Sequence, residues 1–124
     1  MTDDSLSEHF RRAEMECACG CGMVPTPEFM QWIEGLRKAY GSPMLVTSGA
    51  RCAKHNEDVG GAPDSMHVKG LAADVRVAGA AAFKLIGLAH LWGVKGLGVK
   101  QHGPTRFVHL DIGPRETPTV WSYP

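Results

Sequence analysis

Two segments of alternating apolar and polar residues constrain the fold of this chain most strongly. Residues 71–77 place every second side chain, from Leu71 to Val77, on one apolar face and leave Asp74 on the other. Residues 106–112 repeat the pattern, with Val108 and Leu110 on the apolar face. Strict alternation is typical of strands with one buried face. We therefore predict a sheet whose second face is free to carry polar side chains.

Two helices are predicted beside these strands. The first covers residues 27–40: Thr26 suits the N-cap, Pro27 the first helical position, and Gly41 with Pro43 the end of the helix. Its apolar residues recur at spacings of four, three and four, and they are Phe29, Ile33, Leu36 and Tyr40. The second helix is predicted over residues 78–91 and ends near Gly93.

The remaining segments are short. We predict strands at residues 44–47 and 96–100, a turn at Gly103–Pro104 and a long surface loop over residues 48–65. Residues 1–15 are expected to be a loosely attached segment with a short helix over residues 5–15, weakly anchored by Phe10 and Met15. This order predicts an α+β fold in which a small, largely antiparallel sheet is flanked by two main helices. The 124 residues, 1–124, suit a single domain.

Composition and charge exclude several classes of protein. Thirteen basic residues balance thirteen acidic ones, so we expect no nucleic-acid partner. The longest apolar run, residues 80–92, is interrupted by Lys84, Gly87 and His90, so we expect no membrane span. The first five residues, MTDDS, are acidic where a secretion signal would be basic and then apolar. We expect a monomer without a signal peptide.

The polar face of the two alternating segments gathers residues that can bind a metal. His109 and Asp111 share it in the later segment, Asp74 lies on it in the earlier one, and His67 ends the long loop. A catalytic zinc site uses three such ligands and leaves a fourth position for water, whose pKa zinc lowers from about 15.7 to about 7. Without a metal, the same residues would be a loop histidine, a capping or ion-paired aspartate and a hydrogen-bonded sheet histidine. Spacing alone leaves both interpretations open.

Residues 65–74, SMHVKGLAAD, resemble the Ser-x-His-x-x-Gly-x-Ala-x-Asp signature of the zinc D-alanyl-D-alanine peptidases, whose superfamily includes the hedgehog signalling domain fold. The similarity continues upstream through TSGARC at residues 47–52, HN at 55–56 and GGA at 60–62, and downstream through FVHLD at 107–111. It spans about residues 16–124 and is closest to a small, single-domain branch that ends near a Trp, as at Trp121. That branch is common in bacteriophages and bacterial envelopes. The resemblance implies a fold of the hedgehog and D,D-peptidase type.

By position, the resemblance implies that zinc is bound by His67, Asp74 and His109 and that the substrate site is lined by Arg51 and Ser65. An arginine guanidinium can hold a peptide carboxylate or a developing oxyanion, and a serine hydroxyl can hydrogen-bond the substrate. Arg51 could equally brace its loop through backbone carbonyls or Asp58.

One position departs from the family pattern. Many members carry an acidic general base three positions before the second histidine, and this chain has Arg106 there, which cannot accept a proton at working pH. The candidates for the base are then Asp111, on the same strand face as His109, and His102, in the preceding turn. Asp111 equally suits a role in orienting His109. A pocket that binds without catalysing is the third possibility.

Four cysteines complete the set of reactive residues. Cys17, Cys19 and Cys21 form a Cys-x-Cys-x-Cys cluster, and Cys52 lies in the long loop. They could hold a structural zinc through four thiolates, although the usual Cys-x-x-Cys pairs are absent. In an oxidising compartment Cys52 could form a disulfide with one of the other three. The third possibility is four free thiols.

The resemblance predicts a zinc metallopeptidase, either a D-alanyl-D-alanine carboxypeptidase or an endopeptidase, that acts on peptidoglycan stem or cross-bridge peptides. It would degrade the cell wall as a phage endolysin, a virion-associated hydrolase or an envelope-remodelling enzyme. Such a chain would be made in the cytoplasm and act at the wall or in the periplasm, after release or as part of a virion. The alternative is a phage or envelope binding and assembly module that keeps the fold without hydrolysis, which Arg106 favours.

Overall fold

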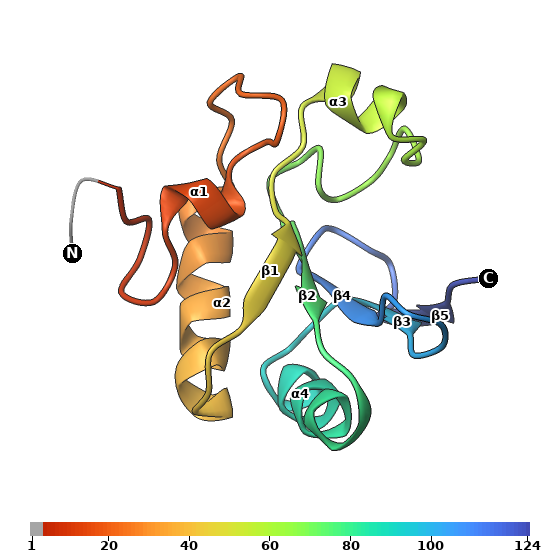
Figure 1. Ribbon diagram of the computed structural model, residues 1–124. Helices are drawn as coiled ribbons and strands as arrows, with labels where there is room; N and C mark the ends of the chain where they lie inside the picture. The colour runs from red at the N-terminus through yellow and green to blue at the C-terminus, as the bar shows by residue number, and fades with distance from the viewer. Residues whose placement is uncertain (1–3) are drawn as a thin grey trace.

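The computed structural model describes residues 4–124. Residues 1–3, part of the acidic terminus used in the signal-peptide argument and of the predicted N-terminal segment, lie outside that range. The described helices are α1 (Arg12–Met15), α2 (Pro27–Tyr40), α3 (Ala53–Asp58) and α4 (Gly79–Leu91), as Figure 1 shows. The described strands are β1 (Leu45–Ser48), β2 (Ala72–Arg76), β3 (Gly96–Lys100), β4 (Phe107–Asp111) and β5 (Thr119–Ser122).

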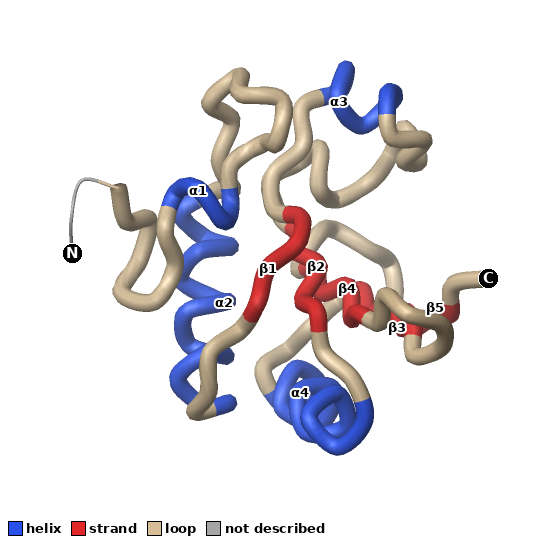
Figure 2. Tube along the Cα trace, in the orientation of Figure 1, coloured by secondary structure: helices blue, strands red, loops and turns tan. Residues whose placement is uncertain are grey.

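The strands form one sheet in the order β1-β2-β4-β3-β5 (Figure 2). The pairs β1–β2, β2–β4 and β3–β4 are antiparallel, and β3–β5 is parallel. The predicted α+β class with a largely antiparallel sheet is therefore confirmed. The register of the two central strands sets Asp74 directly opposite His109. The two alternating segments thus bring their polar residues together at the middle of the sheet.

Helix α2 begins and ends through the local interactions that its sequence predicts. The Thr26 hydroxyl accepts a hydrogen bond from the backbone N–H of Phe29 at 3.1 Å, and Pro27 opens the helix. Gly41 adopts φ of 77°, and its N–H donates to the carbonyl of Arg37 at 3.0 Å. That left-handed conformation is accessible to glycine at little cost, so the helix stops there.

One face of the sheet packs against α2 and α4 to form the core. In Figure 1, α2 runs alongside β1 while α4 lies by the ends of β2 and β4. The buried side chains include Phe29, Ile33, Leu36, Val75, Leu85, Val108 and Leu110. Full burial of each such side chain contributes roughly 1.5–3 kcal/mol relative to exposure. The core therefore uses the apolar strand face, and the opposite face is left for Asp74 and His109.

Two predictions about local structure were wrong, and one strand was missed. The loop predicted over residues 48–65 contains the short helix α3, whose sequence AKHNED has no apolar stripe to reveal it. The helix expected over residues 5–15 is reduced to the single turn of α1. Strand β5 was not predicted, because its four residues lie among prolines and it pairs with β3 only through the tertiary fold.

The N-terminal segment is also more closely packed than its sequence suggested. Phe10 and Met15 are almost fully buried, at 1% and 0% exposure, within the main core. Glu34 on α2 accepts hydrogen bonds from the Ser7 hydroxyl and the His9 backbone, at 2.7 and 2.6 Å. These contacts hold the described part of the segment against α2. None of the helices within residues 4–124 has the length and apolar character needed to cross a membrane.

Candidate metal centre and active site

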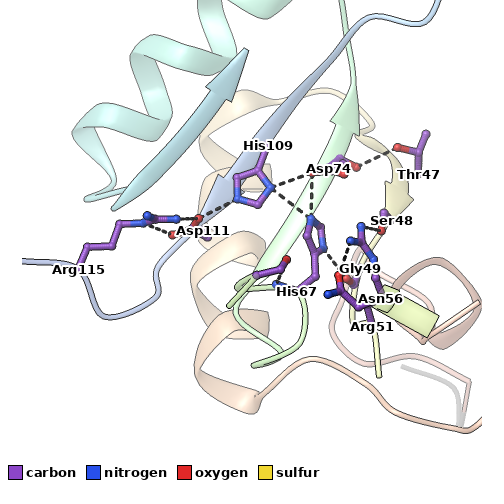
Figure 3. A network of polar contacts seen from close by, with 11 residues as sticks. Thr47, Ser48, Gly49, Arg51, Asn56, His67, Asp74, His109, Asp111 and Arg115 are labelled. Atoms are coloured by element: carbon purple, nitrogen blue, oxygen red, sulfur yellow. Dashed lines mark hydrogen bonds and ion pairs between the residues drawn. The ribbon is translucent and has the colours of Figure 1, made fainter. Parts of the chain in front are cut away.

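Three side chains converge at the middle of the polar sheet face. Asp74 comes from β2, His109 from β4, and His67 from the turn that precedes β2 (Figure 3). Their facing atoms form a nearly equilateral triangle. Asp74 Oδ1 lies 3.2 Å from His67 Nε2 and 3.0 Å from His109 Nδ1, and the two nitrogens are 3.2 Å apart. The sequence-based grouping of these three residues is matched by their positions.

The outer nitrogens of the two histidines determine which way their lone pairs point. His67 Nδ1 lies 2.7 Å from the carbonyl oxygen of Gly49, and His109 Nε2 lies 2.7 Å from Asp111 Oδ2. Because a carbonyl and a carboxylate only accept hydrogen bonds, both outer nitrogens must carry the proton. In the neutral tautomers, the lone pairs of His67 Nε2 and His109 Nδ1 therefore point inward, toward Asp74.

Three electron-rich atoms that face one another at about 3 Å are stabilised by positive charge between them, which a proton or a metal ion can supply. Zinc–nitrogen and zinc–oxygen bonds of about 2.0–2.1 Å with tetrahedral angles separate the ligand atoms by about 3.3 Å. The observed separations of 3.0–3.2 Å are within a few tenths of an ångström of that value. Two histidines and one carboxylate also leave one tetrahedral position open, as catalytic zinc sites do. The residues present therefore fit zinc.

The pKa values of the cluster reflect the same preference for positive charge. Burial raises the pKa of Asp74, but hydrogen bonds with His109 and His67 outweigh burial and hold that pKa well below its usual range. Burial lowers the pKa of His109, but its bonds to Asp111 and Asp74 raise it above the ordinary histidine value. The first shift keeps the Asp74 carboxylate ionised, and the second favours a proton on His109, with which a bound metal would compete.

Asp111 supports His109 from the side away from Asp74. It is fully buried at 0% exposure, and its carboxylate accepts two hydrogen bonds from the Arg115 guanidinium, at 2.7 and 3.2 Å. The Gly113 N–H donates a further bond at 3.3 Å. Gly96 packs so closely on this carboxylate that an added Cβ would overlap it. With both oxygens engaged, Asp111 is placed to orient His109 and is poorly placed to take a proton from water in the cleft.

The second candidate base, His102, is not brought into the site. It is exposed in the turn between β3 and β4, and its Nε2 lies 3.2 Å from the Tyr123 carbonyl oxygen. Arg106 is also remote from the cleft, because its guanidinium donates to the Gly103 carbonyl and lies beside Arg76 on another surface. Residue 106, which is often acidic in the family, therefore does not line the cleft in this chain.

A cleft of about 480 Å³ opens over the three converging residues. Arg51 and Ser65, the predicted substrate residues, both line it. Arg51 donates to Asn56 Oδ1 at 2.9 Å and to Ser48 Oγ at 3.0 Å, in place of the Asp58 contact considered above. Both partners are neutral, so these contacts brace the guanidinium without cancelling its charge. Arg51 therefore braces its loop and also lines the cleft.

Several residues of the cleft were not identified from the sequence as site residues. They are Asp64, Phe107, Arg115, Trp121 and Tyr123. The ring of Trp121 packs 5.2 Å from that of His109, and the Arg115 guanidinium lies 5.1 Å from the Trp121 ring centre. Asp111 and Arg115 lie four residues apart, but the chain after Asp111 is not helical, so this spacing was no sequence signal for their ion pair. No sequence pattern indicated that β5 would bring Trp121 to the cleft.

Comparison with known protein families shows which family the chain belongs to. The family model described as peptidase M15 matches residues 8–111, which include all three converging residues. The chain belongs to the peptidase M15 family. It is thus a member of a metallopeptidase family, and the expected resemblance to the zinc D-alanyl-D-alanine peptidases is confirmed. No curated protein matches the chain.

Proposed function

We propose that this M15 family member is a zinc-dependent peptidase that cuts a peptide bond in peptidoglycan stem or cross-bridge peptides. The observation that carries the proposal is the inward-facing triangle of His67, Asp74 and His109 within an open cleft. Zinc in that triangle would polarise the scissile carbonyl and activate water for attack. A purely structural zinc site would have four protein ligands and no cleft over it.

The charges of the cleft suit a peptide with free carboxylates. Arg51, whose guanidinium bonds only neutral groups, and Ser65 both line it. Arg115 lines it as well, with its guanidinium ion-paired to Asp111. Arginine binds carboxylates through paired, charge-assisted hydrogen bonds. Peptidoglycan stem peptides carry such free carboxylates, so this lining supports the proposed substrate class. A place of action at the cell wall, after release or within a virion, follows from the same substrate.

Asp64 is the proposed proton acceptor. Two aspartates line the cleft, Asp64 and Asp74, and Asp74 is committed to the two histidines. Asp64 is exposed, precedes Ser65 and acts electrostatically on the Arg115 guanidinium. It is the remaining carboxylate of the cleft lining, so we assign it the role of taking a proton from the attacking water. Replacement by the isosteric amide, D64N, should lower kcat with little change in KM. A D58N variant, which changes an exposed aspartate on α3, is the matched control.

The test of the activity uses metal-free protein with purified cell-wall peptides, with and without added Zn²⁺, and mass spectrometry of the products. We expect fragments only when zinc is present and none from H67A. H90A, which removes an exposed histidine on α4, should cleave like the wild type. Release of a terminal D-alanine would identify a carboxypeptidase, and opened cross-bridges an endopeptidase. Absence of cleavage by zinc-loaded wild-type protein would refute the proposal.

The alternative function is a binding or assembly module that keeps the fold without hydrolysis. Arg106 favours it, because the position carries no acid and lies away from the cleft. A binding module would retain wall-peptide affinity in both the wild type and H67A without producing fragments. Equilibrium binding of the same peptides to the two proteins therefore separates the two functions.

A further inference from the structure

A second group of metal-binding side chains lies outside the candidate active site. It consists of Cys17, Cys19 and Cys21, in the loop after α1, and Cys52, directly before α3. The four Sγ atoms all lie within 4.8 Å of one another. Cys19 Sγ is 3.4 Å from Cys17 Sγ and 3.6 Å from Cys52 Sγ. Two chain segments more than thirty residues apart therefore contribute to one sulfur cluster.

The loop backbone turns so that three alternate cysteines can converge. In an extended strand, Cys17, Cys19 and Cys21 would share one face at spacings too wide for a common ligand. Here Gly20 and Gly22 adopt φ of 86° and 88°, in the left-handed region that favours glycine. The Gly20 N–H donates to the Cys17 carbonyl at 3.2 Å, which closes the turn. The interleaved glycines are thus what makes the Cys-x-Cys-x-Cys spacing workable.

Backbone N–H groups also point at two of the sulfurs. The Cys52 N–H donates to Cys17 Sγ at 3.3 Å, and the His55 N–H donates to Cys52 Sγ at 3.4 Å. Such donors stabilise the thiolate form, which is the form that ligates metals. Only Cys17 is buried, whereas Cys19 and Cys21 are exposed, so an ion could reach the cluster from solvent.

We propose that Cys17, Cys19, Cys21 and Cys52 bind one structural Zn²⁺ ion through four thiolates. With zinc–sulfur bonds of about 2.3 Å, a tetrahedral site separates its sulfurs by about 3.8 Å, against about 2.05 Å in a disulfide. The observed 3.4 and 3.6 Å lie close to the tetrahedral value. Four protein ligands close the coordination sphere, so the site is structural and not catalytic. Binding releases the protons of those thiols that are protonated without metal.

The role that follows is to fix one wall of the active-site cleft. Residues 49–52 run from the Gly49 carbonyl, which holds His67, through Arg51, which lines the cleft, to Cys52. The Ala50 N–H donates to the Met15 carbonyl at 2.8 Å, and the Arg51 N–H donates to the His67 carbonyl at 3.1 Å. A metal joining Cys52 to the loop after α1 would hold this segment in place from its other end.

The test measures metal content in the full chain, purified with reductant and without chelator. H67A isolates the cysteine site, and the double variant C19S/C21S removes it at two exposed positions. By elemental analysis, we expect one zinc per chain in H67A and none in the triple variant H67A/C19S/C21S. A18S, an exposed change in the same loop, is the matched control and should bind like the wild type.

Spectroscopy and thiol reactivity identify the ligands. Cobalt-loaded H67A should show thiolate-to-cobalt charge-transfer absorption in the near ultraviolet, and cobalt-treated H67A/C19S/C21S should not. The thiols of H67A should resist alkylation until a chelator is added, and the chelator should lower the Tm of H67A but not that of H67A/C19S/C21S. Four freely reactive thiols in metal-exposed H67A, or a disulfide found under native conditions, would overturn the proposal. Because H67A is used throughout, these outcomes do not depend on peptidase activity.

Discussion

Replacing Asp111 with asparagine tests how the protein holds the lone pair of His109 inward. The Asp111 carboxylate only accepts hydrogen bonds, from His109 Nε2, the Gly113 N–H and the Arg115 guanidinium. An asparagine offers one oxygen and one NH₂ group in almost the same shape. If the NH₂ group is turned toward Arg115 and Gly113, it faces other hydrogen-bond donors. If it is turned toward His109, it donates to Nε2 and forces His109 into the opposite tautomer. In that tautomer the proton sits on Nδ1, where the metal would bind.

The expected magnitude comes from the contacts that are lost. Removing a group that orients a metal-ligating histidine typically weakens metal affinity 10–100-fold, which is about 1.4–2.7 kcal/mol. Breaking the buried ion pair with Arg115 should also lower the free energy of unfolding. Loss of one partner of a buried pair costs about 3–5 kcal/mol, and we expect the lower end because the Arg115 side chain is 25% exposed.

The assay is competition for Zn²⁺ against a chromophoric chelator, with unfolding of the metal-free proteins measured in parallel. D58N, an exposed aspartate-to-amide change, is the control and should bind zinc like the wild type. R115Q keeps the Asp111 carboxylate and should weaken zinc binding less than D111N, which gives a second measurement if D111N folds poorly. Equal zinc affinity in folded D111N and wild type would refute the orienting role.

Three further predictions concern stability and packing. F10A should lower the free energy of unfolding by about 3–5 kcal/mol, because Phe10 is buried in the main core. Urea denaturation measures this change. A decrease of less than about 1 kcal/mol would mean that the N-terminal segment is loosely attached. G96A should weaken zinc binding, since its Cβ would overlap the Asp111 carboxylate, whereas G87A on α4, where a Cβ meets no neighbour, should not. Burial raises the pKa of Glu34, but hydrogen bonds from His9 and Ser7 outweigh it and lower that pKa below its ordinary value. The ionised Glu34 carboxylate therefore stabilises the folded state. Its contribution is fully present above the pKa of about 4.3 that a glutamate has in the unfolded chain, and it is lost as the pH falls through the lower pKa of the folded state. The stability difference between wild type and E34Q should therefore shrink as urea denaturation is repeated at lower pH, and a difference independent of pH would contradict the assignment.

The active-site residues were predictable to different degrees for physical reasons. The candidate metal-ligand set could be found because alternation fixes which side chains leave the core face, and because His67 ends the long loop just before the strand and lies in the Ser-x-His-x-x-Gly-x-Ala-x-Asp pattern. The role of Asp111 could not be decided, because orienting a ligand and accepting a proton require the same residue type on the same strand face. Only its burial and its bonds to Arg115 separate the two roles.

The sequence alone determined the elements whose signals are local. The alternation in β2 and β4, the capping of α2 at Thr26 and the stop at Gly41 each depend on neighbouring residues, and the structure reproduces them. Tertiary structure decided what depends on distant partners. Strand β5 forms because β3 offers it an edge, and it brings Trp121 to His109. Cys52 meets Cys19 for the same reason: a contact across 33 residues depends on how the whole chain packs, and no local pattern encodes it.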